Sequence, residues 1–295
     1  MSKRAIFWGS LGVLVYAYAG FPLLVAARAL VRNRPIKVGD GFPNVTVVIP
    51  AYNEVGIIAE KLDNVLSLGY PPERLEIIVA SDGSDDGTND VVRAHWADVR
   101  LLPLPRVGKN AALNEAAAAT RGEILVFTDA DAKMTEHTLH YIVAPFGDPE
   151  VGGVAGERRH GEVSSPKGLA AAGKRLFREL LSRSGSATSA EGQIYAVRRE
   201  LFQPAPRNVP DDFWISTRVV ALHSRLVYEP RAILWHPHRL DLPGLSRQIH
   251  RYGVGLSAAL PHIPSREPPA SATRSSARSA WQARRSAPSG SLATS

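Results

Sequence analysis

Short apolar runs alternate with amphipathic stretches along the first half of the chain. The apolar runs are rich in β-branched residues, which predicts buried strands. Between them apolar residues recur at helical spacing, as in VGIIAEKLDNVLSL and GKNAALNEAAAAT. The predicted strands lie at 44–50 (NVTVVIP), 75–81 (LEIIVAS), 99–104 (VRLLPL) and 123–129 (EILVFTD). This alternation predicts an α/β fold with a doubly wound, mostly parallel sheet.

The pattern is less regular between residues 151 and 255. We expect an amphipathic helix over 168–184, a strand leading into a basic turn over 192–202, and a helix over 211–223. From residue 264 the chain is dominated by Ser, Ala, Pro and Arg, which predicts a disordered tail over 264–295. The folded domain should therefore cover 38–263, in two halves at 38–150 and 151–263.

The N-terminal segment from Ala5 to Ala27 holds 23 residues without a charge. About 20 such residues span a bilayer. A cleaved signal peptide has a shorter apolar region and a small-residue cleavage site, whereas ARALVRNR follows here. We expect one retained transmembrane helix within 1–37. The positive-inside rule places the remaining chain in the cytoplasm, at the cell (inner) membrane, because Lys3 and Arg4 precede the span and more bases follow it (Arg28, Arg32, Arg34 and Lys37).

The distribution of charge favours a membrane surface over a nucleic acid. The net charge of the chain is +7. Residues 1–40 carry a net +5 and residues 265–295 a net +4, while the segment between them carries a net −2. An acidic centre between basic flanks suits a lipid surface. The chain has no cysteine, which excludes disulfides and thiolate zinc sites.

Acidic side chains follow three of the predicted strands. Glu54, Asp82 and the Asp129–Asp131 pair lie at strand exits, where ligands bind in doubly wound sheets. In an extended backbone Asp129 and Asp131 would point to the same side. Two such carboxylates can share Mg²⁺ or Mn²⁺ with phosphate oxygens. The alternative is a solvated loop of acidic turn residues.

Two further patterns bear on ligand binding. Gly108-Lys109 opens a predicted helix, and a helix N-terminus with a lysine favours an anion such as a diphosphate. The histidine pairs His137/His140 and His236/His238 have metal-ligand spacing, but no third ligand follows at zinc-site spacing, so we expect no zinc site.

Seven motifs taken together resemble the family 2 glycosyltransferases, in the membrane-bound, synthase-like branch with the GT-A fold. The resemblance covers about Val45 to Gly255. The motifs, in order, are VVIPAYNE (47–54), SDGSDDGT (81–88), GKNAALNEA (108–116), TDADA (128–132), GQIYAVRRE (192–200), PDDFWISTRV (210–219) and RQIHRYGVG (247–255).

This resemblance implies a metal-dependent, inverting transferase of hexosyl or N-acetylhexosaminyl groups. The implied donor is a nucleotide sugar, with a UDP-sugar favoured, and the implied acceptor is a saccharide or lipid-linked molecule, with polysaccharide synthesis among the expected roles. Residues 38–150 would then bind the donor and residues 151–263 the acceptor.

The resemblance also implies roles for individual residues. Glu54 and Asp82 match nucleotide-contacting positions, Lys109 a donor-side cation, and Asp129 and Asp131 the D-x-D motif that holds the metal on the diphosphate.

On the acceptor side, Asp212 matches the catalytic base, and Asp211 stands where the family has Glu. Gln248, Arg251 and Tyr252 match the Q-x-x-R-W motif near the acceptor and diphosphate, with Tyr252 in the place of Trp.

Two other functions remain open from the sequence. Phosphoryl transfer of the haloacid-dehalogenase type also uses D-x-D after a strand, although Lys133 occupies its Thr/Val place and the strand is the fourth. The second is an inactive or partner-binding membrane protein of the same fold, acting with another membrane protein. It is suggested because family members usually continue into further transmembrane helices, whereas PSREPPASATRSS follows here.

Overall fold

The computed structural model describes residues 3–95, 99–160, 169–187, 189–190, 194–236 and 253–254. The predictions for Gln248, Arg251 and Tyr252, and for the tail over 264–295, fall outside the described residues.

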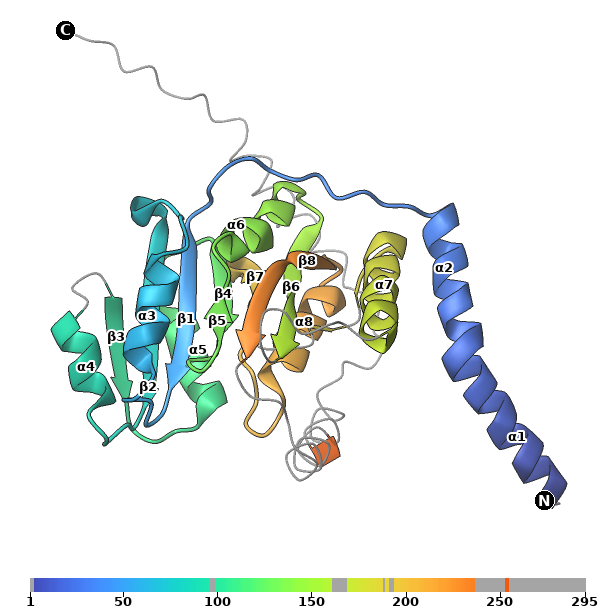
Figure 1. Cartoon of the computed structure of the whole chain (residues 1–295), viewed down its shortest axis with the longest axis horizontal. Helices are drawn as coiled ribbons and strands as arrows, with labels where there is room; N and C mark the ends of the chain where they lie inside the picture. Colours follow the sequence, from blue (N-terminus) through green and yellow to red (C-terminus); the bar gives the residue numbers. More distant parts are fainter. Residues whose placement is uncertain are drawn as a thin grey trace, which may run out of the picture. The chain divides into compact units, whose positions relative to one another are not determined.

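A mixed sheet forms the centre of the described domain (Figure 1). Its strand order is β3-β2-β1-β4-β7-β6-β8-β5. The first four strands are mutually parallel, β7 runs antiparallel to both β4 and β6, and β8 runs parallel to β6 and antiparallel to β5. The strands are β1 Val45–Ala51, β2 Leu75–Asp82, β3 Val99–Leu104, β4 Ile124–Thr128, β5 Lys133–Met134, β6 Val151–His160, β7 Ile194–Arg198 and β8 Arg225–His236.

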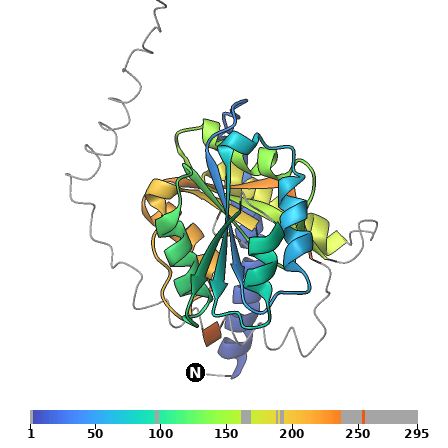
Figure 2. The same cartoon turned by 90° about the vertical axis from the view of Figure 1, so that its left-hand side faces the viewer.

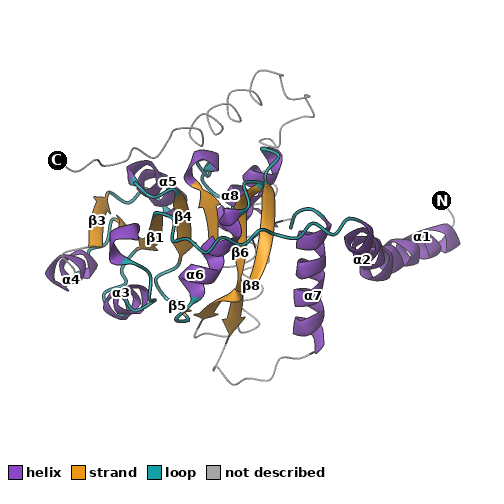
Figure 3. Cartoon of the chain, turned by 90° about the horizontal axis from the view of Figure 1, so that it is seen from above, coloured by secondary structure: helices purple, strands orange, loops and turns teal. Residues whose placement is uncertain are grey.

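Helices cover both faces of the sheet, which confirms the doubly wound prediction (Figures 2 and 3). In Figure 3, α3, α4 and α6 lie on one face and α5 and α8 on the other. These helices are α3 Ile58–Leu66, α4 Thr88–His95, α5 Lys109–Ala119, α6 Thr138–Val143 and α8 Asp211–Ala221. Short 3₁₀ turns lie at η2 Pro72–Arg74, η3 Ala144–Gly147 and η4 Arg199–Leu201.

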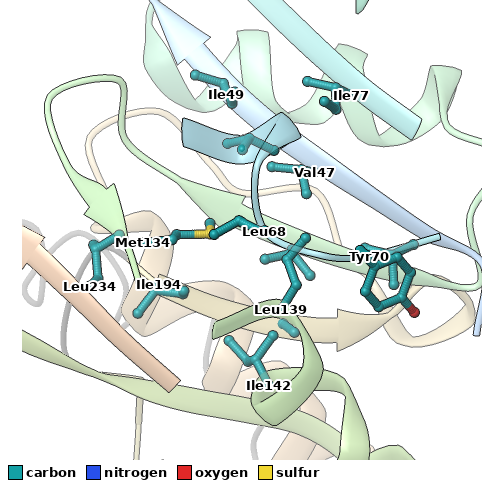
Figure 4. Close-up of a cluster of buried hydrophobic side chains, with 14 of the residues drawn as sticks. Val47, Ile49, Leu68, Tyr70, Ile77, Met134, Leu139, Ile142, Ile194 and Leu234 are labelled. Atoms are coloured by element: carbon teal, nitrogen blue, oxygen red, sulfur yellow. The ribbon is translucent and has the colours of Figure 1, made fainter. Parts of the chain in front are cut away.

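One core cluster joins the sheet to α3 and α6. Every second residue of β1 contributes to this cluster, and two of them, Val47 and Ile49, are fully buried. Figure 4 shows these residues together with Leu139 and Ile142 of α6, and with Met134 of β5 and Leu234 of β8 near one edge of the sheet. The buried apolar side chains of this cluster fix the strands whose ends carry the acidic residues.

Strands β6 and β8 were not predicted from the sequence. The sequence of β6 contains Gly152, Gly153 and Gly156, which lower strand propensity. The structure shows the reason for the first glycine, because a Cβ on Gly152 would lie 2.6 Å from Cβ of Ser224 and 2.9 Å from Cγ1 of Val219. These glycines let α8 and the start of β8 approach the sheet closely.

The N-terminal helical segment is continuous over Lys3–Val31, formed by α1 Lys3–Val15, a π-helical turn η1 Tyr16–Gly20 and α2 Phe21–Val31. It has a mean hydropathy of 1.8 and is long and apolar enough to cross a membrane by length and composition. Only Val25 and Ala29 of this segment are buried. It is therefore not the core helix of a soluble domain.

The end of this segment contacts the domain through α7 Leu169–Ser184 (Figure 1). The rings of Phe21 and Phe177 meet edge to face at 5.9 Å between centroids. Arg28 Nε donates a hydrogen bond to the Ser184 carbonyl at 3.2 Å. The contacts attach the apolar helix to the domain at its C-terminal end.

Candidate active site

The carboxyl ends of β1, β2 and β4 open into one cavity of about 290 Å³. Its wall includes most of the acidic residues singled out from the sequence. The lining residues are Pro50, Ala51, Tyr52, Glu54, Asp82, Arg106, Lys109, Asp129, Ala130 and Asp131. The structure thus brings together the predicted donor-side residues, although Asp211 and Asp212 are not among the residues that line this cavity.

The loop after β1 is fastened to the loop after β2. Asn53 adopts a positive φ of 56°, and its side chain exchanges hydrogen bonds with Asp85 at 2.9 and 3.1 Å. The backbone N–H of Glu54 donates to Thr88 Oγ1 at 2.9 Å. Burial raises the pKa of Glu54, and nearby Asp131 adds to this effect. A cation in the cavity would therefore stabilise the ionised form of Glu54.

Asp82 anchors the turn that starts α5. Its side chain is 3% exposed and accepts hydrogen bonds from Arg106 and from the backbone N–H groups of Val107 (2.7 Å) and Gly108 (2.9 Å). Gly108 has a φ of 94°, which glycine adopts readily. The guanidinium of Arg106 lies 3.4 Å from the ring centroid of Tyr52. Nucleotide contact by Asp82 stays a prediction, and both of its oxygens already accept protein hydrogen bonds.

Lys109 contacts carboxylates from two distant parts of the chain. Its Nζ lies 3.0 Å from Asp129 Oδ1 and 3.2 Å from Asp211 Oδ1. Burial lowers the pKa of Lys109, but the two carboxylates outweigh burial and raise the pKa above the usual range of lysine. Lys109 is therefore a fixed positive charge at the cavity wall.

Asp131 faces His236, the last residue of β8. His236 Nε2 lies 3.0 Å from Asp131 Oδ2, and this hydrogen bond lowers the pKa of Asp131 more than burial raises it. Asp131 Oδ1 is buried and has no hydrogen-bond partner among the described residues. A carboxylate oxygen in this condition fits a cation. In the described part of the chain, no group of three or more His, Asp or Glu side chains is placed to hold a metal.

The backbone between the two aspartates differs from the sequence-based expectation. The chain turns at Ala130 and Asp131, so the argument from an extended backbone was wrong. The two carboxylates have different partners, with Asp129 on Lys109 and Asp131 on His236.

Asp212 lies in the first turn of α8 with 9% of its surface exposed. Its Oδ1 accepts a hydrogen bond from the backbone N–H of Phe213 at 2.8 Å. A helix N-terminus stabilises the ionised form of such a carboxylate. Its role as the catalytic base remains a prediction.

A buried lysine supports the loop that carries the two aspartates. Lys61 of α3 is 2% exposed, and its Nζ donates to Thr128 Oγ1 at 2.9 Å and to the Ala132 carbonyl at 2.5 Å. These two acceptors flank the turn on both sides. Burial lowers the pKa of Lys61 to about 7, against the opposing effect of Asp129 and Asp131.

The Lys61→Met variant should lose a pH dependence of stability that the natural protein has. The unfolded chain titrates this lysine near pH 10.4, so between pH 7 and 10 the unfolded state binds more protons than the folded state. The free energy of unfolding of the natural protein should therefore rise with pH relative to the variant, by at most about 1.4 kcal/mol per pH unit. Denaturant unfolding at several pH values measures this difference.

Lys133→Met is the matched control, because Lys133 directly follows Ala132, whose carbonyl Lys61 contacts, but is 56% exposed and pairs with Glu60. Equal slopes of stability against pH in the natural protein and in Lys61→Met would contradict the assignment of the buried charge.

Sequence reasoning missed several residues in or next to this site: Lys61, Arg106 and His236. Lys61 occupies an apolar position of an amphipathic helix, which was an available signal. His236 was considered only as a partner of His238, which lies outside the described residues. The contacts of Arg106 and His236 come from distant segments and depend on the fold.

A sheet of this topology, with acids and a lysine at its strand ends, is the arrangement of a GT-A glycosyltransferase. The chain is similar to the mannosyltransferase of Pyrobaculum calidifontis solved with GDP-Man and Mn²⁺, with 29% identity and a TM-score of 0.69, over 87% of this chain and 76% of that one. The chain belongs to glycosyl transferase family 2, whose model matches residues 46–203.

Curated relatives agree with this assignment. The chain is 27% identical over 213 residues to the probable glycosyltransferase YdaM of Bacillus subtilis, over 65% of this chain and 50% of that protein. It is 27% identical over 226 residues to the poly-β-1,6-N-acetyl-D-glucosamine synthase of Staphylococcus epidermidis, over 72% of this chain and 54% of that protein. The chain therefore spans about half the length of these relatives.

Proposed function

We propose that this chain is an inverting, metal-dependent transferase that moves a hexosyl or N-acetylhexosaminyl group from a nucleotide sugar to a saccharide or lipid-linked acceptor. The observation that carries the proposal is the cavity that gathers Glu54, Asp82, Lys109, Asp129 and Asp131 at the strand ends. A cavity with this mixture of charges suits a metal-bound diphosphate. Membership of glycosyl transferase family 2 argues against a phosphotransferase.

The side chains that would hold Mg²⁺ or Mn²⁺ are Asp131 and Asp129, with His236 beside Asp131. The unpartnered Oδ1 of Asp131 supports this assignment. Mg²⁺ commonly takes only one or two carboxylates and completes its shell with water and substrate phosphates. When bound, the metal would supply positive charge to the leaving diphosphate.

The remaining residues position the two substrates. Lys109 binds the diphosphate from the N-terminus of α5. Glu54 and Asp82, which also line the cavity, are the proposed nucleotide contacts. The acceptor hydroxyl attacks the anomeric carbon while Asp212 accepts its proton. The bond to the nucleoside diphosphate breaks in the same step, which inverts the anomeric centre. A general base raises the rate of such a reaction by roughly 10²–10⁴-fold. Residues 38–150 form the donor half and residues 151–263 the acceptor half.

The choice of donor rests on similar proteins. A UDP-sugar is the proposed donor, because the relative from Staphylococcus epidermidis makes a polymer of N-acetylglucosamine. A GDP-sugar is the alternative, since the mannosyltransferase structure contains GDP-Man.

The proposed location is the cytoplasmic face of the cell membrane, with one span. The apolar segment Lys3–Val31 supports this, together with the basic residues that follow it. We expect the full-length protein to remain in the membrane pellet after carbonate extraction, and a reporter fused after Ser295 to be cytoplasmic. Release of the protein by carbonate would contradict the span, and an external reporter would contradict the orientation.

The activity is tested by incubating membranes that contain the chain with UDP- and GDP-sugars, with Mn²⁺ or with EDTA. We expect metal-dependent release of the nucleoside diphosphate above membranes that lack the chain. Nucleotide binding without turnover would favour the inactive, partner-binding alternative instead.

A further inference from the structure

Tyr195 is held rigidly between the two halves of the site. It lies on β7 directly opposite Phe127 of β4, and it is 2% exposed. The rings of Tyr195 and Phe127 stack with centroids 4.9 Å apart, and Phe202 stacks on Phe127 at 5.9 Å. Because Phe127 precedes Asp129 by only two residues, this stack couples the position of Tyr195 to the loop that carries the D-x-D motif.

The only polar atom of this side chain has a defined partner. Tyr195 Oη donates a hydrogen bond to Asp211 Oδ2 at 3.0 Å. Burial raises the pKa of Tyr195 well above its usual value, and Asp211 adds to the effect, so the hydroxyl keeps its proton. A phenylalanine would fill the same stack. Tyr195 therefore differs from a phenylalanine at this position by its hydrogen bond to Asp211.

Both carboxylate oxygens of Asp211 have a partner. Oδ2 accepts from Tyr195, and Oδ1 lies 3.2 Å from Lys109 Nζ. The same Nζ lies 3.0 Å from Asp129 Oδ1. The resulting chain of contacts is Tyr195–Asp211–Lys109–Asp129. It runs from α8 to the cavity, and it occupies both carboxylate oxygens of Asp211.

We propose that Tyr195 is a positioning residue, which fixes Asp211 as the counter-ion that holds Lys109 at the cavity wall. This inference rests on the proposed function, because it assigns Lys109 to the donor diphosphate. In this arrangement Asp211 serves donor binding although it belongs to α8, and Asp212 alone serves the acceptor. A lysine held in place before the diphosphate arrives binds it without the loss of side-chain entropy that a free lysine would suffer.

The first test is a double-mutant cycle on nucleotide binding by the full-length protein in detergent. Tyr195→Phe and Asp211→Asn should each weaken binding of UDP with Mn²⁺ by about tenfold, the size expected for a hydrogen bond to a charged group. In the Asp211→Asn background, Tyr195→Phe should change the Kd less than twofold, because the two residues act through one contact. If the double variant instead showed a loss of affinity equal to the product of the two single losses, the proposal would be overturned.

Tyr228→Phe is the matched control. Tyr228 is also buried and donates to a carboxylate, Glu157, but Glu157 pairs with Arg178 and not with Lys109. It should leave the Kd for UDP unchanged. An equal loss in Tyr228→Phe and Tyr195→Phe would mean that any buried tyrosine hydroxyl acts through the stability of the fold, and it would overturn the proposal.

A second readout needs no nucleotide. Lys109 is 45% exposed and can be labelled by acetic anhydride, with Lys133 as an internal reference. Labelling of Lys109 should be several-fold faster in Tyr195→Phe and in Asp211→Asn than in the natural protein. Unchanged labelling would overturn the proposal. Faster labelling, in a protein that binds neither UDP nor GDP, would uphold the positioning of Lys109 and refute the proposed function.

Discussion

Replacing Asp131 with asparagine is expected to lower the rate of sugar transfer by about 10³-fold, to near the background of the assay. The substitution keeps the size of the side chain but removes the charge at the oxygen that lacks a partner. Stabilisation of a leaving group by a metal contributes several kcal/mol, and each 1.36 kcal/mol is a factor of ten in rate. The fold should survive, because Asp131 lies in a turn with 40% of its side chain exposed. Initial rates at saturating Mn²⁺ and donor measure the effect.

The matched control for this variant is Asp90→Asn. Asp90 is 85% exposed and pairs only weakly with Arg93 on the surface of α4. It should transfer sugar at the natural rate. Full turnover by Asp131→Asn, or undiminished activity of the natural protein in EDTA, would remove the metal from the mechanism.

Asp212→Asn is expected to cut transfer by about 10²-fold or more while leaving nucleotide binding unchanged. A base acts on the acceptor hydroxyl and need not contact the donor. The substitution is conservative, since asparagine has the same size and keeps an oxygen that can accept the hydrogen bond from the Phe213 N–H. The loss should therefore appear in kcat and not in the melting temperature or in the Kd for UDP.

Asp211→Asn separates the two neighbouring carboxylates. It should weaken nucleotide binding, because Asp211 holds Lys109, and should lower kcat less than Asp212→Asn does. An active Asp212→Asn enzyme, or one that loses donor binding in parallel with rate, would show that the base has been assigned to the wrong residue.

The strands and strand-end residues between 38 and 150 were predicted well from the sequence because their signals are local. The strands β1, β2 and β4 are almost continuous runs of buried apolar residues, and each ends at a polar loop. In a parallel sheet such loops must meet at one edge. Glu54, Asp82, Lys109, Asp129 and Asp131 therefore could be gathered from the sequence alone.

The second half could not be predicted to the same extent. Strand β6 contains three glycines and strand β8 contains Pro230, and both features weaken the strand pattern. The pairing of β7 between β4 and β6 is set by packing and not by any local signal. The contacts of Tyr195 with Asp211 and of His236 with Asp131 depend on that pairing, so spacing along the chain gave no indication of them.

The central claim is that a metal-bound nucleoside diphosphate occupies the cavity at the strand ends. The most direct test is calorimetric titration of UDP and of GDP into the full-length protein in detergent, with Mn²⁺ and with EDTA, for the natural chain and for Asp131→Asn. The account predicts binding of at least one nucleotide with Mn²⁺, and a loss of about 100-fold in affinity on adding EDTA or on replacing Asp131. Binding of equal strength in all of these conditions, or no binding of either nucleotide by the natural chain, would contradict it.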